Sequence, residues 1–174
     1  MDELARAFVG EARQHLLADY LPKLERCAER LTDEQAWRRA GEESNSIGNL
    51  LLHLEGNARQ WLVGGVGGAP DRRRRDREFG ERAPVPLAQL MADLRAALEE
   101  ADAVLARLDP PALLERRLIQ GHDVTVLAAV FHVVEHFSMH TGQIILLTKM
   151  LTGRDLAFYD FSDGTPRPAW HEKQ

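Results

Sequence analysis

The stretch Ala128–Met150, AAVFHVVEHFSMHTGQIILLTKM, is long and mostly apolar, and it predicts a buried helix. It carries His132, His136 and His140 at intervals of four residues. In a helix, each step of four residues advances about 40° around the axis and about 6 Å along it, so the three imidazoles lie on one face. Each neighbouring pair could chelate one metal ion, but the end pair is separated by a rise of about 12 Å. A metal site would therefore take two of these histidines and a ligand from elsewhere in the chain.

Three other segments have the apolar spacing of amphipathic helices. They are residues 2–31, a helix from about Ser46 to the glycine-rich residues 64–68, and residues 87–108. Pro22 should kink or split the first of them, because proline has no N–H to donate and clashes with the preceding turn.

The histidine-bearing helix should begin at a cap formed by Asp123 or Thr125. Residues 69–86 are expected to be irregular, and no segment has a strand pattern. Four amphipathic helices without strands predict an all-α four-helix bundle. The C-terminal extension, residues 154–174, should pack on this bundle at least as far as Phe161. The lengths of the connections leave open whether the bundle is up-down-up-down or contains a crossover.

The composition is that of a single domain of 174 residues, with a core at about residues 2–153. A net charge of −5 gives no electrostatic footprint for nucleic acid. Cys27 is the only cysteine, so no internal disulfide can form, which fits a reducing compartment. It follows the apolar face of its helix and is predicted to be a core residue. The N-terminus has no signal-peptide core and no apolar run reaches membrane-spanning length, so we expect a cytoplasmic protein.

His53 lies at the rim of the apolar face of the second helix and is a candidate third ligand. Burying several imidazoles costs desolvation free energy unless each has a partner, and a metal ion is one such partner. A polar seam of histidines bonded to backbone groups and to Glu135 is an equally good interpretation. The spacing does not decide whether His136 would pair with His132 or with His140.

Other polar residues near this pattern have weaker claims. Gln143 lies on the same helix face and could orient a ligand or a bound water. Glu55 and Glu135 could act as acid–base groups or support a ligand, although ion pairing or solvent exposure is favoured for both. The isolated histidines are expected to face solvent; they are His15, His122 and His171.

Two segments resemble the signature segments of the DinB-like (YfiT-like) superfamily. They are SIGNLLLHL at residues 46–54 and HFSMHTGQI at residues 136–144. RDREF at residues 75–79 and TGRDL at residues 152–156 resemble one branch of it. The resemblance covers roughly residues 5–160. Its most specific part is a lone histidine in the second helix combined with His-x-x-x-His-x-Gly-Gln in the last.

This resemblance implies an up-down-down-up bundle, commonly a homodimer, with a divalent metal held by His53, His136 and His140. His132 would then be an outer group or a wall of the pocket. Characterised relatives are S-transferases and an isomerase that use small thiols such as bacillithiol or mycothiol, and others are described as hydrolases. We therefore expect a metal-dependent S-transferase or hydrolase with a small-molecule substrate and Zn²⁺ or Ni²⁺ as the favoured metal. The alternative is a non-catalytic, dimeric metal- or small-molecule-binding protein.

Four consecutive arginines, Arg72–Arg75, and Arg77 lie in the connection after the second helix, together with Asp71, Asp76 and Glu78. The favoured interpretation is a solvated loop with internal ion pairs. The alternative is a clamp for a carboxylate of the substrate or of a thiol cofactor, because guanidinium forks match carboxylates. The interleaved acids and the negative net charge oppose nucleic-acid binding.

Overall fold

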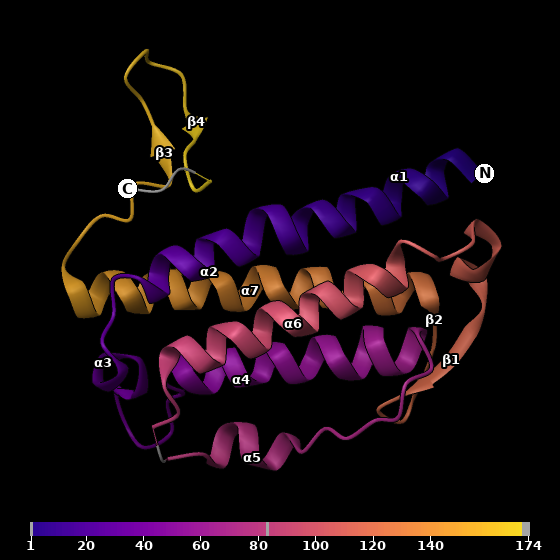
Figure 1. Ribbon diagram of the computed structural model, residues 1–174, viewed down its shortest axis with the longest axis horizontal. Coiled ribbons are helices and arrows are strands. Elements are labelled where there is room, and N and C mark those ends of the chain that lie inside the picture. Colours follow the sequence, from indigo (N-terminus) through magenta and orange to yellow (C-terminus); the bar gives the residue numbers. More distant parts are fainter. Residues whose placement is uncertain (1, 83, 172–174) are drawn as a thin grey trace.

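The computed structural model describes residues 2–82 and 84–171, in which four long helical segments form a bundle (Figure 1). In chain order they are α1 (Asp2–Arg13) continued by η1 (Gln14–Tyr20) and α2 (Leu21–Ala28), α4 (Ile47–Ala58) continued by η2 (Arg59–Val66), α6 (Leu87–Leu105) and α7 (Val126–Thr152). In Figure 1, α4 and α6 run from left to right, whereas α1–α2 and α7 run from right to left. The all-α four-helix bundle predicted from the sequence is confirmed.

The first segment accommodates its proline without leaving the helical conformation. Pro22 stands in the first turn of α2, and the preceding η1 is a π-helix in which Leu21 N–H donates to the Leu16 carbonyl, five residues back. A π-helical turn is wider than an α-helical one and shifts the hydrogen-bond register by one residue. The predicted kink or split therefore takes the form of a π-helical stretch.

Side-chain caps fix where the two histidine-bearing helices begin. Ser46 Oγ accepts from the backbone N–H of Asn49, and the Asn49 side chain accepts in return from the Ser46 N–H, which together form a capping box at the start of α4. Thr125 caps α7 by accepting from the Ala128 N–H at 3.1 Å. Gly153, with φ of 64°, closes α7 in the left-handed conformation. These caps set the positions of the histidines along both helices.

The prediction that the chain contains no strands is wrong. β1 (Arg116–Ile119) and β2 (His122–Thr125) form an antiparallel hairpin between α6 and α7. The two turn residues, Gln120 and Gly121, have φ of 53° and 82°, as a tight two-residue hairpin turn requires. Each strand is only four residues long, too short for a hydrophobic alternation to give a signal.

Residues 69–86, expected to be irregular, contain the short helix α5 (Arg75–Gly80), so that expectation is wrong for this stretch. In Figure 1, α5 lies alongside α4, against which it packs. Two other short helical elements are α3 (Asp33–Trp37), capped by Thr32 in a capping box, and the 3₁₀ helix η3 (Pro110–Leu114).

The tail beyond α7 packs on the first helical segment only in part. Leu156 is fully buried, and Trp170 Nε1 donates to a backbone carbonyl of η1 at 3.1 Å. Between them, β3 (Tyr159–Asp160) and β4 (Arg167–Pro168) form a small hairpin that projects from the bundle (Figure 1). Phe161 follows β3 and is 62% exposed, so the prediction that packing extends to this residue is wrong.

Inward-facing apolar side chains from all four segments build the core; they include Leu24, Leu54, Leu94 and Phe137, each at most 1% exposed. α4 packs against both α6 and α7. His53 thus lies on a helix that is held directly beside the helix carrying the other histidines. Within the part of the chain that the structure describes, no helix has the length and apolar character needed to cross a membrane.

Candidate metal centre

His53 on α4 meets His136 and His140 on α7. One ring nitrogen from each of the three lies within 4.8 Å of the other two. The Nε2 atoms of His53 and His136 are 2.8 Å apart, and the ring centroids of the three residues are 4.4 to 5.1 Å apart. The structure therefore brings together the pair His136 and His140, with His53 as the third nitrogen donor.

A buried carboxylate lies on the other side of the His53 ring. Glu78 Oε2, from α5, is 2.8 Å from His53 Nδ1, and both side chains are at most 9% exposed. Arg73 Nη2 is 3.0 Å from the same ring nitrogen, but it donates to Glu78 Oε2 at 2.9 Å, so it does not require a lone pair on Nδ1. A carboxylate can only accept, so we assign the His53 proton to Nδ1, which leaves the Nε2 lone pair directed at the other histidines.

Arg73 in turn holds Glu78 in place. Its Nε donates to Glu78 Oε1 at 2.7 Å and its Nη2 donates to Oε2 at 2.9 Å, a two-pronged pairing. Burial alone raises the pKa of Glu78, but the hydrogen bonds from Arg73 and His53 outweigh it, so the pKa lies below its usual value. The carboxylate is therefore ionised at neutral pH.

Two features of α4 allow α5 to come this close. Asn49 Nδ2 donates to the backbone carbonyls of Glu78 at 2.8 Å and of Glu81 at 3.2 Å, which ties the α5 backbone to α4. A Cβ added at Gly56 would overlap Glu78 Oε1, so only glycine leaves room for the carboxylate there. Sequence reasoning missed the contact between Glu78 and His53, because an acid in a charged segment gives no sign of burial.

The third histidine is oriented in a similar way from its own helix. Gln143 Oε1 lies 2.7 Å from His140 Nδ1, and a carbonyl oxygen accepts, so His140 carries its proton on Nδ1 and its Nε2 is free to bind. His140 is 9% exposed, whereas Gln143 is exposed.

The surroundings of His136 and His140 favour neutral imidazoles. Burial lowers the pKa of His136 to about 3, with further lowering from the neighbouring His140, His53 and His132 and from Arg73. Burial is also the main cause that lowers the pKa of His140. Neutral rings with free lone pairs are what a divalent cation requires of its ligands.

The donor set fits a divalent metal. Two nitrogens that each lie about 2.1 Å from one tetrahedral ion are roughly 3.4 Å apart. In this structure the nitrogens of His53 and His136 are 2.8 Å apart, and all three candidate nitrogens lie within 4.8 Å of one another, so the spacing expected around an ion falls inside the observed range. Ring nitrogens assigned as proton carriers each face an oxygen acceptor, from Glu78 or Gln143. This is the arrangement found around histidine ligands in metalloproteins.

A family model described as Mycothiol-S-transferase matches residues 13–153. The chain belongs to this family. A search of curated proteins found no match. Among solved structures, a conserved protein from Enterococcus faecalis is similar in fold, with a TM-score of 0.62 and 14% identity over 88% of this chain and 98% of its own. A DinB-like protein from Bacillus cereus has a TM-score of 0.57 and 16% identity over 78% and 89% of the two chains.

In this member of the mycothiol-S-transferase family, the group of His53, His136 and His140 does not include His132. Its Nε2 is 3.3 Å from Asn57 Nδ2, its ring packs on Trp61 with centroids 4.2 Å apart, and it stacks on His136 at 5.3 Å. It therefore lies next to His136, between that ring and Trp61. Glu135 is exposed and makes no hydrogen bond or ion pair among the described residues, although its charge opposes the lowering of the pKa of His132.

The remaining candidates lie away from the histidines. Glu55 forms an ion pair with Arg59 on the other face of α4, as favoured from the sequence. Cys27 is fully buried in the core. Of the isolated histidines, His122 and His171 are exposed, whereas His15 is only half-exposed and is hydrogen-bonded to Asp19 at 2.8 Å.

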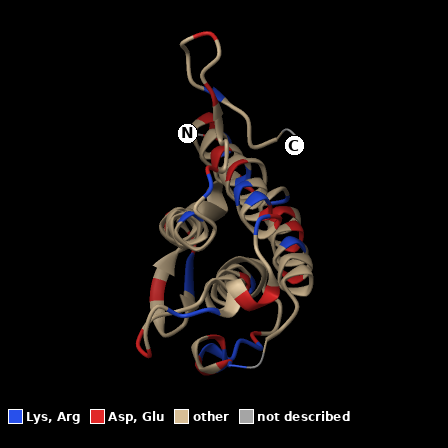
Figure 2. Ribbon diagram, turned by 90° about the vertical axis from the view of Figure 1, so that its left-hand side faces the viewer, with Lys and Arg blue, Asp and Glu red and all other residues tan. Residues whose placement is uncertain are grey.

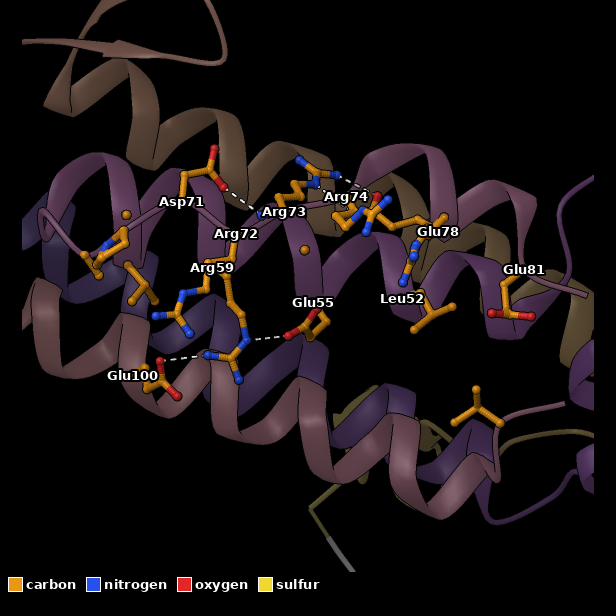
Figure 3. A pocket seen from close by; sticks show the side chains of 17 residues that line it. Leu52, Glu55, Arg59, Asp71, Arg72, Arg73, Arg74, Glu78, Glu81 and Glu100 are labelled. Carbon is orange, nitrogen blue, oxygen red and sulfur yellow. Dashed lines mark hydrogen bonds and ion pairs between the residues drawn. The ribbon is translucent and has the colours of Figure 1, made fainter. Parts of the chain in front are cut away.

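The arginine-rich segment divides into a buried and an exposed part. The Arg73 side chain is 3% exposed and pairs with Glu78, which agrees with the favoured interpretation of internal ion pairing. The other arginines of the run are exposed, and Figure 2 shows basic and acidic residues interleaved around α5. Several of them line a cavity of about 480 Å³ on the α6 side of α4 (Figure 3).

Proposed function

We propose that this protein is a divalent-metal-dependent S-transferase that joins a small thiol to an electrophilic substrate. The observation that carries the proposal is the convergence of His53, His136 and His140 from two helices, with nitrogens within 4.8 Å of one another. Membership of the mycothiol-S-transferase family supports a thiol, rather than water, as the attacking group. A thiol of the mycothiol class is the co-substrate that we propose.

A bound divalent cation would supply a lowered thiol pKa, and hence a thiolate at neutral pH. The three histidines would hold it through neutral nitrogens, and three protein ligands leave coordination positions open. Zn²⁺ and Ni²⁺ suit imidazole ligands and are the metals that we propose.

The residues around the ligands have separate tasks in this proposal. Glu78 and Gln143 keep the Nδ1 protons of His53 and His140 in place, so that both Nε2 lone pairs face the site. Phe79 packs on His53 with centroids 4.6 Å apart and excludes water from that side. His132, partly exposed beside His136, would contact a bound molecule as a wall of the pocket.

We also propose that the protein is a cytoplasmic homodimer. Large apolar side chains on the outer face of α7 support the dimer; they are Phe131, Met139, Leu146 and Met150, between 47% and 70% exposed. They recur along a single helix, and apolar surface gathered on one element can mark an interaction site. Light scattering coupled to size exclusion tests this point, and a monomer at micromolar concentration would contradict it.

The central experiment measures metal content and thiol conjugation on the same preparations. Wild type should contain about one metal per chain and conjugate a small thiol to an electrophile such as monochlorobimane. The variant His136→Ala should lose both properties, because it removes one of the three nitrogens. The matched control His132→Ala, one turn earlier on α7, should keep the metal.

Three outcomes separate the alternatives. Metal without thiol conjugation for any small thiol would favour the non-catalytic binding protein. Conjugation that survives a chelator would reject the metal-dependent mechanism. Equal metal content in wild type and His136→Ala would reject the three-histidine site.

A further inference from the structure

The arginine-lined cavity is separate from the candidate metal centre. It has a volume of about 480 Å³ and lies between α4–η2, α6 and residues 69–81 (Figure 3). Arg73 and Glu78 line it, whereas none of the three clustered histidines does. The ion pair of Arg73 with Glu78 therefore stands between this cavity and His53. A volume of this size falls in the range of small-molecule sites.

The carboxylates that line the cavity already have partners. Arg59 pairs with Glu55 and with Glu100, and Arg73 pairs with Glu78. Asp71 accepts from Gln60 Nε2 at 2.7 Å and from the Arg73 N–H at 2.9 Å, and Glu81 accepts from the backbone of residue 82.

Three guanidinium groups around the cavity are left over. Among the described residues, the side chains of Arg72, Arg74 and Arg77 make no hydrogen bond or ion pair, and all three line the cavity. In Figure 3, the side chain of Arg72 reaches the same end of the cavity as Arg59. The lining as a whole is balanced, with five arginines and five carboxylates, but these three guanidiniums have no acceptor, and an anion among them would supply one.

We propose that this cavity binds a small organic anion with two or more carboxylates. The guanidinium forks match carboxylates in geometry. Apolar wall residues, among them Leu52, Val63 and Val85, would cover a short carbon skeleton between the charged groups. The cavity is concave and small, so a compact ligand fits and an extended nucleic acid does not. This inference stands independently of the proposed thiol transfer.

The test is calorimetric titration of the full-length protein at low ionic strength, with citrate as the carboxylate probe and inorganic phosphate as a second probe. Arg72→Gln/Arg74→Gln/Arg77→Gln should bind citrate at least about tenfold more weakly than wild type, since charge-assisted hydrogen bonds are lost. The matched control removes three exposed guanidiniums elsewhere and should bind like wild type; it is Arg6→Gln/Arg107→Gln/Arg154→Gln.

Further measurements make the result decisive. Circular dichroism verifies that both triple variants are folded, and Arg77→Gln alone should weaken citrate binding in the same direction. His136→Ala should bind citrate as wild type does, which separates this cavity from an anion held by a metal. The proposal would be overturned if wild type does not bind citrate. It would also be overturned if the control triple variant loses as much citrate affinity as the Arg72/Arg74/Arg77 variant, or if His136→Ala no longer binds citrate. Tighter binding of phosphate than of citrate would overturn the assignment to carboxylates.

Discussion

Glu78 Oε2 lies 2.8 Å from His53 Nδ1, although the two residues are 25 positions apart. Both side chains are buried, and Arg73 fixes the carboxylate from its other side. This contact couples the short helix α5 to the candidate metal centre on α4 and α7. It also decides which His53 nitrogen carries the proton, and therefore which nitrogen can bind a metal.

Removing the charge of Glu78 should weaken metal binding without removing a ligand. We expect Glu78→Gln to lower the affinity about 10- to 100-fold, because the amide holds the His53 proton less firmly and makes the ring a poorer donor. Competition with a chromophoric chelator measures this affinity on the full-length protein. Glu55→Gln is the matched control, since Glu55 pairs with Arg59 on the opposite face of α4. Equal affinities for both variants would show that Glu78 does not support the site.

A methyl group at Gly56 should act on the same contact from the helix side. A Cβ there would overlap Glu78 Oε1, so Gly56→Ala should displace the carboxylate and lower metal affinity. Gly142→Ala is the control, because its Cβ would meet open space, and it should stabilise α7 by about 0.5–1 kcal/mol. Thermal unfolding and chelator competition on both variants provide the measurements. A Gly56→Ala variant with full metal affinity would contradict this account.

Helical periodicity predicted the four long helices and the row of histidines on α7. The spacing of the three histidines on α7 allowed two pairs of metal ligands, His132 with His136 or His136 with His140. It could not select one of them. The resemblance to the DinB-like superfamily implied that the ligands are His136 and His140, together with His53. In the structure these three histidines lie together, because α4 packs against α7 and the N-terminal caps set the position of each histidine along its helix.

The missed features depend on contacts between segments far apart in the chain. The pairing of Glu78 with His53 requires α5 to dock on α4 through Asn49, which no local pattern records. The helix α5 has no apolar periodicity of its own, and its sequence, RDREFG, is mostly charged. The strands β1 and β2, each of four residues, are too short for alternation to reveal them.

The thiol of Cys27 should be inert at neutral pH. Burial raises its pKa to about 11, while a hydrogen bond with Thr148 and the charge of Lys149 act in the opposite direction. The neutral form is favoured in the folded protein, so its stabilisation is full below the usual pKa of 9.0 and is lost as pH rises from 9 towards 11. We expect Ellman's reagent at pH 8 to label Cys27 only after unfolding. The stability of wild type should also fall relative to Cys27→Ala across that window, and rapid labelling of the folded protein would contradict the burial.

Arg26 should anchor the C-terminal tail to α2. It is 4% exposed, and its guanidinium donates to the carbonyls of Ala157 and Ala169, each at 2.6 Å. Arg26→Met keeps the apolar stem but leaves those carbonyls without this donor, which should cost about 2–3 kcal/mol of unfolding free energy. Urea denaturation measures the loss. Chymotrypsin should cut the variant faster in the tail, where Phe161 is already exposed. The exposed Arg107→Met serves as the control, and equal stability and cleavage in the two variants would show that Arg26 does not hold the tail.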